Sequence, residues 1–278
     1  MKPGSMLPHL LNLPNWFTAA SIFCGMYSIV LSADAVGGDS SSLFRAAIAI
    51  VFAGLFDMLD GRVARLTNTA SEFGVQFDSL ADVISFGVAP AFLLYKWGLE
   101  PLGVMGLLVA FVYLAAGAMR LARFNIITHK MSNEWSLGLT ITESGGLVAS
   151  LVICHHQLGG EPISPLVALP LVLGLAYLMG STLRFRTFKR VRMTRQTLTV
   201  LGVLGGVSVL AVLFYQEPTI LLVLLPTAHI VSGLVEELIF YKQRRLEDQQ
   251  LLLVEDVQGA APLGSFSDPD EALEEEVR

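Results

Sequence analysis

Apolar stretches long enough to cross a lipid bilayer dominate this sequence. A membrane-spanning helix needs about 20 mostly apolar residues, because it rises about 1.5 Å per residue through a hydrocarbon core about 30 Å thick. Of the 278 residues, 53% are hydrophobic and 15% are charged, and the mean hydropathy is +0.62. Eight stretches qualify as spans, near residues 16–33, 43–61, 80–96, 101–122, 139–157, 163–181, 198–215 and 218–240. We therefore predict an all-α integral membrane protein, a bundle of about eight transmembrane helices.

The charges of the connections between these stretches alternate. The first, third, fifth and seventh connections carry no Lys or Arg, and their acidic residues are Asp34, Asp39, Glu100, Glu161 and Glu217. The other connections hold nearly all of the basic residues, with the densest cluster between Arg184 and Arg195. Because positively charged loops stay in the cytoplasm, the alternation predicts a multi-pass protein of the cell (inner) membrane with both termini cytoplasmic.

The two ends of the chain differ from the membrane domain predicted for residues 16–245. Residues 1–15 are expected to lie at the membrane interface, since Leu7–Trp16 (LPHLLNLPNW) combines Trp, Pro and Asn with short apolar runs. This beginning lacks the pattern of a signal peptide. Residues 246–278 are acidic, contain Gly and Pro and lack apolar periodicity, so we predict a disordered cytoplasmic tail. Membrane lipids are expected as partners, and nucleic acid is not.

Four aspartates lie in or beside the second and third apolar stretches. They occur in FDMLDGRVARLTNTASEFGVQFDSLADVISFG, at Asp57, Asp60, Asp78 and Asp82. A carboxylate at the centre of a membrane span costs about 2.5–3.5 kcal/mol on insertion scales, so four of them need compensating charge. At about 100° per residue, one helix face would present Asp57, Asp60, Gly61, Ala64 and Arg65, and a second face would present Gly74, Asp78 and Asp82.

Packing these two faces together would gather the carboxylates in one pocket, while Gly61, Ala64 and Gly74 would allow a backbone or ligand to approach closely. Hard divalent cations prefer oxygen ligands, and two such ions suit displacement at phosphorus, where charge accumulates on the leaving phosphate. A transporter also places carboxylates inside the membrane, but its sites are marked by broken helices in two repeated halves. We find no such repeat here.

The spacing D-x2-D-G-x2-A-R-x8-G-x3-D-x3-D resembles the signature of the CDP-alcohol phosphotransferase family, and every position of the pattern is present. The resemblance implies Mg²⁺ or Mn²⁺ bound by the four aspartates, a CDP group held at the cytoplasmic face, and a homodimer. It also implies that Asp82, or less favourably Asp78, is the general base. Four further residues of the signature would contribute to substrate binding: Gly61, Ala64, Arg65 and Gly74.

Three more stretches, PNWFTAASIFCG, GAMRLARFN and STLRFRTFK, resemble the phosphatidylserine synthase branch of this family, and the likeness covers about residues 14–190. It implies transfer of a phosphatidyl group from CDP-diacylglycerol to L-serine with release of CMP. Arg120 and Arg123 lie three apart on one helix face, with Asn125 just beyond, and a guanidinium can bind a carboxylate with two parallel hydrogen bonds.

Other interpretations of these arginines stay open. Glycerol phosphate would attract them too, as in a phosphatidylglycerophosphate synthase, and both can serve simply as cytoplasmic anchors. Arg184 and Lys189 can bind a phosphate of the lipid nucleotide or anionic headgroups. One stretch departs from the branch: where its members have Gly-Leu-Pro after the fourth span, this chain has Gly138, Leu139 and Thr140.

Overall fold

The computed structural model describes residues 12–128, 135–160, 162–181 and 183–186, together with part of 223–231. The chain divides into two compact units, Met1–Leu234 and Val235–Arg278, and all described residues belong to the first. The predicted tail at 246–278 and most of the last two predicted spans therefore lie outside the described residues.

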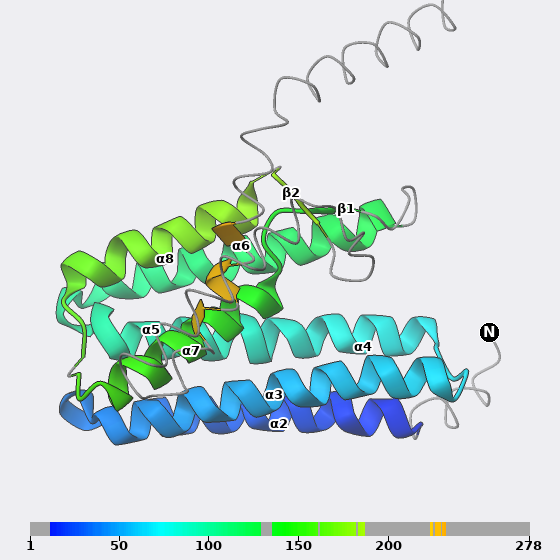
Figure 1. Ribbon diagram of the computed structural model, residues 1–278, viewed down its shortest axis with the longest axis horizontal. Coiled ribbons are helices and arrows are strands. Elements are labelled where there is room, and N and C mark those ends of the chain that lie inside the picture. Colours follow the sequence, from blue (N-terminus) through cyan, green and yellow to red (C-terminus); the bar gives the residue numbers. More distant parts are fainter. Residues whose placement is uncertain are drawn as a thin grey trace, which may run out of the picture. The chain divides into compact units, whose positions relative to one another are not determined.

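The first two helices, α2 (Leu13–Ala33) and α3 (Ser40–Leu66), pack against each other along their lengths (Figure 1). Pro14 lies in the first turn of α2, where its missing N–H group would have no helical partner anyway. Asp39 caps α3, accepting hydrogen bonds from the backbone N–H groups of Ser41 and Ser42, each 3.2 Å long. A further bond from the Ser42 hydroxyl is the main cause of a lowered pKa at Asp39.

The third long helix is continuous from Glu72 to Leu102. It consists of α4 (Glu72–Asp82), a π-helical segment η3 (Val83–Val88), α5 (Ala89–Leu94), a second π-helical segment η4 (Tyr95–Leu99) and a final 3₁₀ turn η5 (Glu100–Leu102). The span predicted at 80–96 starts eight residues later than the observed helix, which begins at Glu72. The first two turns contain polar residues, so hydropathy alone underestimates the length of the helix.

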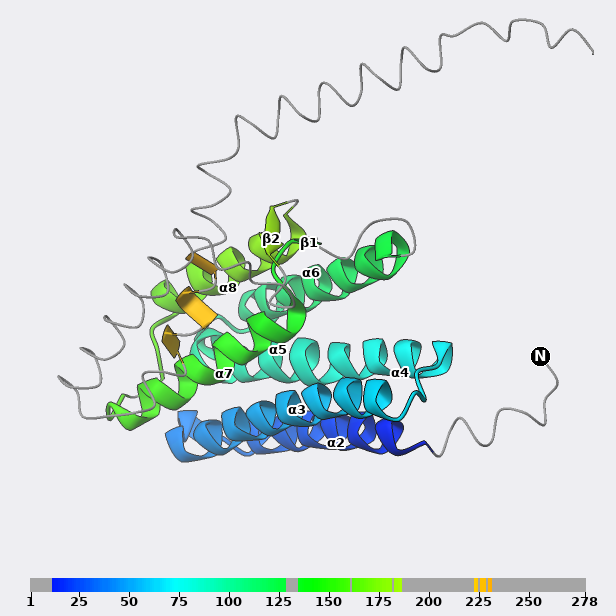
Figure 2. The same ribbon diagram turned by 45° about the vertical axis from the view of Figure 1, so that its right-hand side comes forward.

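Three further helices follow: α6 (Val104–Thr128), α7 (Ile141–Gln157) and α8 (Pro165–Gly180). Two strands of three residues each, β1 (Trp135–Leu137) and β2 (Arg184–Arg186), form an antiparallel pair in which Trp135 lies opposite Arg186. Figures 1 and 2 show this pair beside the ends of α6 and α8. The sequence analysis did not anticipate these strands, because three residues are too few to show an alternating pattern.

Four helices in the described part of the chain are long and apolar enough to cross a membrane: Leu13–Ala33, Ser40–Leu66, Glu72–Leu102 and Val104–Ile126. They coincide with the first four predicted spans and confirm a predominantly helical membrane protein. Helices α7 and α8 match the fifth and sixth predicted spans in position but are shorter, at 17 and 16 residues. The count of eight spans is not confirmed and stays a prediction.

The distribution of side chains is that of a protein dissolved in lipid. Large apolar residues such as Phe23 and Phe111 point outward, with 61% and 59% of their surface exposed. Small hydroxyl residues such as Ser28, Ser32 and Ser85 are buried between the helices. Membrane helices use small residues in this way, because lipid already solvates the large apolar side chains and close helix packing supplies the attraction.

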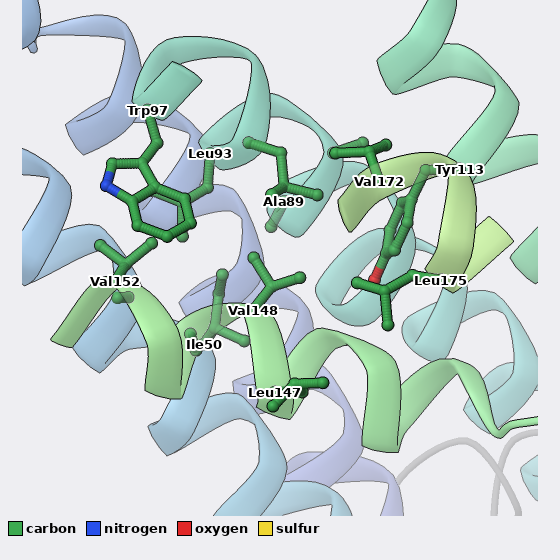
Figure 3. Packing of buried hydrophobic residues seen from close by; sticks show 14 of the residues in the cluster. Ile50, Ala89, Leu93, Trp97, Tyr113, Leu147, Val148, Val152, Val172 and Leu175 are labelled. Carbon is green, nitrogen blue, oxygen red and sulfur yellow. The ribbon is translucent and has the colours of Figure 1, made fainter. Parts of the chain in front are cut away.

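An apolar core surrounds α7 (Figure 3). Val148 and Val152 of α7 point toward Ile50 of α3 and toward Leu93 and Trp97 of the third long helix. The same core includes Ala53, four residues before Asp57, and Phe86, four residues after Asp82, so it fixes the helices that carry the aspartates.

The two kinds of connection lie at opposite ends of this helix assembly. At the acidic end, the Ser40 hydroxyl oxygen lies 2.6 Å from Nδ1 of His156, and a Cβ atom on Gly98 would lie 2.7 Å from Ile163. At the basic end, the Gly138 N–H donates to the Leu183 carbonyl over 2.8 Å. The alternation predicted from charge therefore holds for the connections that the structure describes.

Close packing of α2 on η3 depends on Gly25, which is buried. A Cβ atom at Gly25 would lie 2.8 Å from the Cα atom of Ser85, and a backbone atom cannot move aside as a flexible side chain can. We therefore predict that Gly25→Ala lowers the free energy of unfolding by about 1–3 kcal/mol, the usual cost of overpacking.

Thermal unfolding in detergent micelles measures this effect. The matched control is Gly174→Ala on α8, where nothing lies within 4 Å of the added Cβ atom. The control should be neutral or slightly stabilising, since alanine favours a helix more than glycine does. Equal unfolding temperatures for the two variants would contradict the packing argument.

Candidate active site

Three carboxylates converge where the end of α3 meets the beginning of α4. One oxygen atom each of Asp57, Asp60 and Asp78 lies within 4.8 Å of the others. The helices reverse direction over a short turn in which Asn68 adopts a φ of +53°, a left-handed conformation that Asn tolerates better than most residues. Side chains from the two predicted faces therefore converge, and three of the four predicted carboxylates form one cluster.

Asp82 lies one turn beyond Asp78 on α4 and is not a member of this cluster. The Oδ1 atoms of Asp78 and Asp82 are both buried, and neither has a hydrogen-bond partner within the described residues. A buried carboxylate oxygen normally has a partner, because leaving it unsatisfied costs free energy. Both oxygens are therefore suited to a ligand that binds oxygen atoms.

A residue that the sequence analysis did not single out completes the cluster. Thr18 of α2 is buried and donates a hydrogen bond of 2.7 Å from its hydroxyl to Oδ2 of Asp60. Asp60 is itself only 6% exposed, so this bond orients one of its two oxygens. The signal available in the sequence was the pair Asn15 and Thr18, two polar residues three apart at the beginning of a largely apolar helix.

The predicted acceptor residues Arg120, Arg123 and Asn125 lie in different surroundings. Arg120 is 5% exposed, and its guanidinium lies 5.3 Å from the ring centroid of Phe124. Glu143 and Asp82 attract this buried positive charge electrostatically. Arg123 instead donates to the Ser181 carbonyl (2.9 Å) at the end of α8. Asn125 donates to the Ser79 hydroxyl (3.0 Å), which ties α6 to α4 between Asp78 and Asp82.

The remaining signature residues lie on the same two helices as the aspartates. A Cβ atom at Gly61 would lie 3.7 Å from the Nη1 atom of Arg65, so the glycine leaves space for this guanidinium. Gly74 faces α2, because a Cβ atom there would lie 3.6 Å from Oδ1 of Asn15. Ala64 lies partly buried on α3. The backbone of Arg184 belongs to β2, and Lys189 lies outside the described residues.

The carboxylate cluster fits a hard divalent cation. Its donors are all oxygen atoms, they converge at the spacing of a shared ligand, and Asp78 presents a buried oxygen without a hydrogen-bond partner in the described chain. The basic residues nearest in sequence, Arg62 and Arg65, are exposed. A bound cation would therefore provide the positive charge that three adjacent carboxylates need in a medium of low dielectric constant.

Fold and site together define a class: an integral membrane protein with a carboxylate site, suited to a divalent metal, built between its first three long helices. A family model described as CDP-alcohol phosphatidyltransferase matches residues 11–180, which include all four aspartates. The match covers more than half of the chain. The chain belongs to the CDP-alcohol phosphatidyltransferase family.

Three curated relatives have named activities within this family. The CDP-diacylglycerol–serine O-phosphatidyltransferase of Helicobacter pylori is 43% identical over 183 residues, which are 64% of this chain and 73% of the relative. The enzyme of the same name from Bacillus subtilis is 31% identical over 182 residues, covering 64% of this chain and 92% of the relative. The archaetidylserine synthase of Methanothermobacter thermautotrophicus is 34% identical over 187 residues, covering 66% and 74%.

The hydrogen bond from Thr18 leads to a prediction about metal affinity. Thr18→Val removes the donor but keeps the volume, so Asp60 loses its orientation while all four carboxylates stay. We expect metal affinity to fall about tenfold to a hundredfold, the usual effect of losing a hydrogen bond that orients a ligand. Asp60→Asn should weaken binding further, because it removes a ligand charge.

Titration of the purified variants with Mn²⁺, followed by electron paramagnetic resonance, measures affinity without turnover. Thr67→Val is the matched control, since the Thr67 hydroxyl bonds the Val63 carbonyl and is exposed. Unchanged affinity in Thr18→Val would show that this hydrogen bond does not support a metal site.

Proposed function

We propose that this protein transfers the phosphatidyl group of CDP-diacylglycerol to L-serine, forming phosphatidylserine and CMP. The observation that carries the proposal is the family signature, because three of its four aspartates meet in one partly buried cluster. The choice of serine rests on the named activities of relatives that are 31–43% identical to this chain.

Two Mg²⁺ or Mn²⁺ ions are the proposed cofactors, and the residues that would hold them are Asp57, Asp60, Asp78 and Asp82. Such ions, when bound, neutralise the pyrophosphate and stabilise the charge that develops on the departing CMP. Thr18 orients Asp60, and the hydrogen bond from Asn125 to Ser79 holds α6 beside the two aspartates of α4.

Asp82 is the proposed general base. It lies one turn beyond Asp78, outside the three-carboxylate cluster, and its buried Oδ1 atom has no hydrogen-bond partner among the described residues. As the serine oxygen attacks the phosphorus atom that bears the diacylglycerol, Asp82 accepts the hydroxyl proton. A new P–O bond to serine forms while the P–O bond to CMP breaks in line with it.

The outward apolar faces of the helices leave the diacylglycerol chains in lipid while the headgroup enters the site. The CDP group is proposed to lie over Gly61, Ala64, Arg65 and Gly74, which lie at the end of α3 and the start of α4. Arg184 and Lys189, in the following basic cluster, are proposed to bind a phosphate of the lipid nucleotide. Arg120 is the proposed partner of the serine carboxylate.

The membrane arrangement is proposed from the charge alternation. Eight spans within residues 16–245 would place the interfacial segment 1–15, the tail 246–278 and the site on the cytoplasmic face of the cell membrane. The aspartates lie toward the end of the helix assembly that holds the basic connections, which supports this orientation. A homodimer is proposed from the family resemblance alone.

Release of CMP tests the proposed reaction. Purified protein with CDP-diacylglycerol and Mg²⁺ or Mn²⁺ should release CMP when L-serine is added, and should release much less without an acceptor or with glycerol 3-phosphate. Asp82→Asn is the matched control, because it keeps the shape of the side chain and removes the base. Release with glycerol 3-phosphate alone would identify a phosphatidylglycerophosphate synthase, and solute flux without CMP release would identify a transporter.

Labelling of single cysteines tests the orientation. After Cys24 and Cys154 are replaced by alanine, Val36→Cys and Leu158→Cys should react in intact cells with an impermeant maleimide. Asn68→Cys should react only after the membrane is opened, since it follows the basic end of α3. All three positions are exposed in the structure. Labelling of Asn68→Cys in intact cells would show that the orientation is reversed.

A further inference from the structure

A proline interrupts the hydrogen bonding of the third long helix. Pro90 is the second residue of α5, which directly follows the π-helical segment η3. Proline has no backbone N–H group, so the Phe86 carbonyl, four residues earlier, cannot receive the hydrogen bond that an α-helix would give it. In membrane helices, local π-helical geometry and side chains of neighbouring helices satisfy the backbone groups that a proline frees. The π-helical segment therefore lies where the proline disturbs the helix.

The hydroxyl of Tyr113 supplies a donor at this position. Tyr113 lies on α6, is fully buried in the apolar core (Figure 3), and donates to the Phe86 carbonyl oxygen over 3.4 Å. A buried tyrosine hydroxyl costs free energy unless it has a hydrogen-bond partner, and a carbonyl freed by proline is such a partner. Pro90 and Tyr113, on different helices, therefore complement each other at one peptide group.

Two other helices hold the same segment. From α2, the Ser21 hydroxyl donates to Oγ of Ser85 over 3.2 Å, and the Ser85 hydroxyl donates to the Ser21 carbonyl over 3.0 Å. From α7, the backbone approaches closely at Gly145, where a Cβ atom would lie 3.1 Å from the Cα atom of Phe86. Segment η3 is thus held by α2, α6 and α7.

The proposed base Asp82 is the residue at which α-helical geometry ends and π-helical geometry begins. The hydrogen bonds of a π-helix span five residues instead of four, so such a segment changes the rotation of the helix before it relative to the helix after it. After η3, Leu93 and Trp97 pack in the apolar core. Before it, Asp78 and Asp82 carry the two buried oxygens that suit a ligand. The geometry of η3 therefore determines how these carboxylates are turned relative to the rest of the protein.

We infer that Tyr113 is a positioning residue for Asp82. By donating to the carbonyl that Pro90 leaves without its usual helical donor, Tyr113 holds η3 in its π-helical form, and η3 in turn fixes the direction of the Asp82 carboxylate. The inference rests on the proposed function, in which Asp82 accepts the proton of the serine hydroxyl. Proton transfer needs the base within hydrogen-bond reach of that hydroxyl, so a small rotation of α4 would slow the chemical step.

Tyr113→Phe tests the inference, because it removes the hydroxyl and keeps the aromatic ring. The kcat of serine-dependent CMP release should fall about threefold to tenfold, the rate effect of one hydrogen bond between uncharged groups. The KM values for serine and CDP-diacylglycerol should stay nearly unchanged, since Tyr113 lies in the apolar core. Tyr177→Phe on α8 is the matched control: this tyrosine is 73% exposed, and its loss should change neither kcat nor KM.

Pro90→Ala tests whether Tyr113 acts through the Phe86 carbonyl. Alanine restores the backbone N–H group, so this carbonyl regains a helical donor. In the Pro90→Ala background, Tyr113→Phe should therefore lower kcat much less than it does in the wild type. Pro90→Ala should also lower kcat by itself, because it favours α-helical over π-helical geometry. An equal fall in both backgrounds would overturn the inference, as would an unchanged kcat in Tyr113→Phe alone.

Amide hydrogen exchange of residues 83–89, followed by mass spectrometry, measures the state of η3 without turnover. Tyr113→Phe should speed exchange in this segment more than in α2, since exchange reports local opening. If Pro90→Ala does not fold, this measurement decides: faster exchange together with a lower kcat supports the inference, and unchanged exchange overturns it. Wild-type protein that releases no CMP with serine would refute the proposed function instead, and the exchange of residues 83–89 would still show whether Tyr113 holds η3.

Discussion

The carboxylates of Asp57, Asp60 and Asp78, gathered within 4.8 Å in a membrane protein, are the constraint on which the rest of the structure depends. Like charges repel strongly where the dielectric constant is low, so the fold must hold them together and must also leave room for a cation. The short turn at Asn68 brings α3 and α4 together, and the hydrogen bond from Thr18 attaches α2 to the same cluster. The first three long helices are thus organised around one site.

Close helix packing makes this arrangement possible. At Gly25 the backbone of α2 approaches that of η3, and at Gly117 the α6 helix approaches the start of α7. In lipid the association of helices draws on such contacts, because burying apolar side chains brings little gain there. The same small residues therefore determine how closely α2 packs on η3 and how closely α6 packs on α7.

The two arginines at the end of α6 illustrate how one motif can serve two purposes. Arg123 holds the end of α8 through the Ser181 carbonyl, whereas Arg120 is buried and interacts with Asp82 and Glu143. A buried guanidinium needs negative partners, because an unpaired charge inside the membrane is costly. Two arginines three positions apart thus lie in different surroundings: Arg123 fastens α6 to the end of α8, and Arg120 is a buried charge.

The sequence by itself determined the membrane class, the first four spans and the family, because hydropathy and the spacing of eight signature residues are properties of the linear chain. It also placed the aspartates on two helix faces, and three of their carboxylates converge. Only the tertiary structure decided which side chains meet across elements: Thr18 donates to Asp60, Asn125 donates to Ser79 beside Asp78, and Arg123 donates to the Ser181 carbonyl. These contacts join residues far apart in sequence, and they depend on helix crossings and rotations that no local pattern specifies.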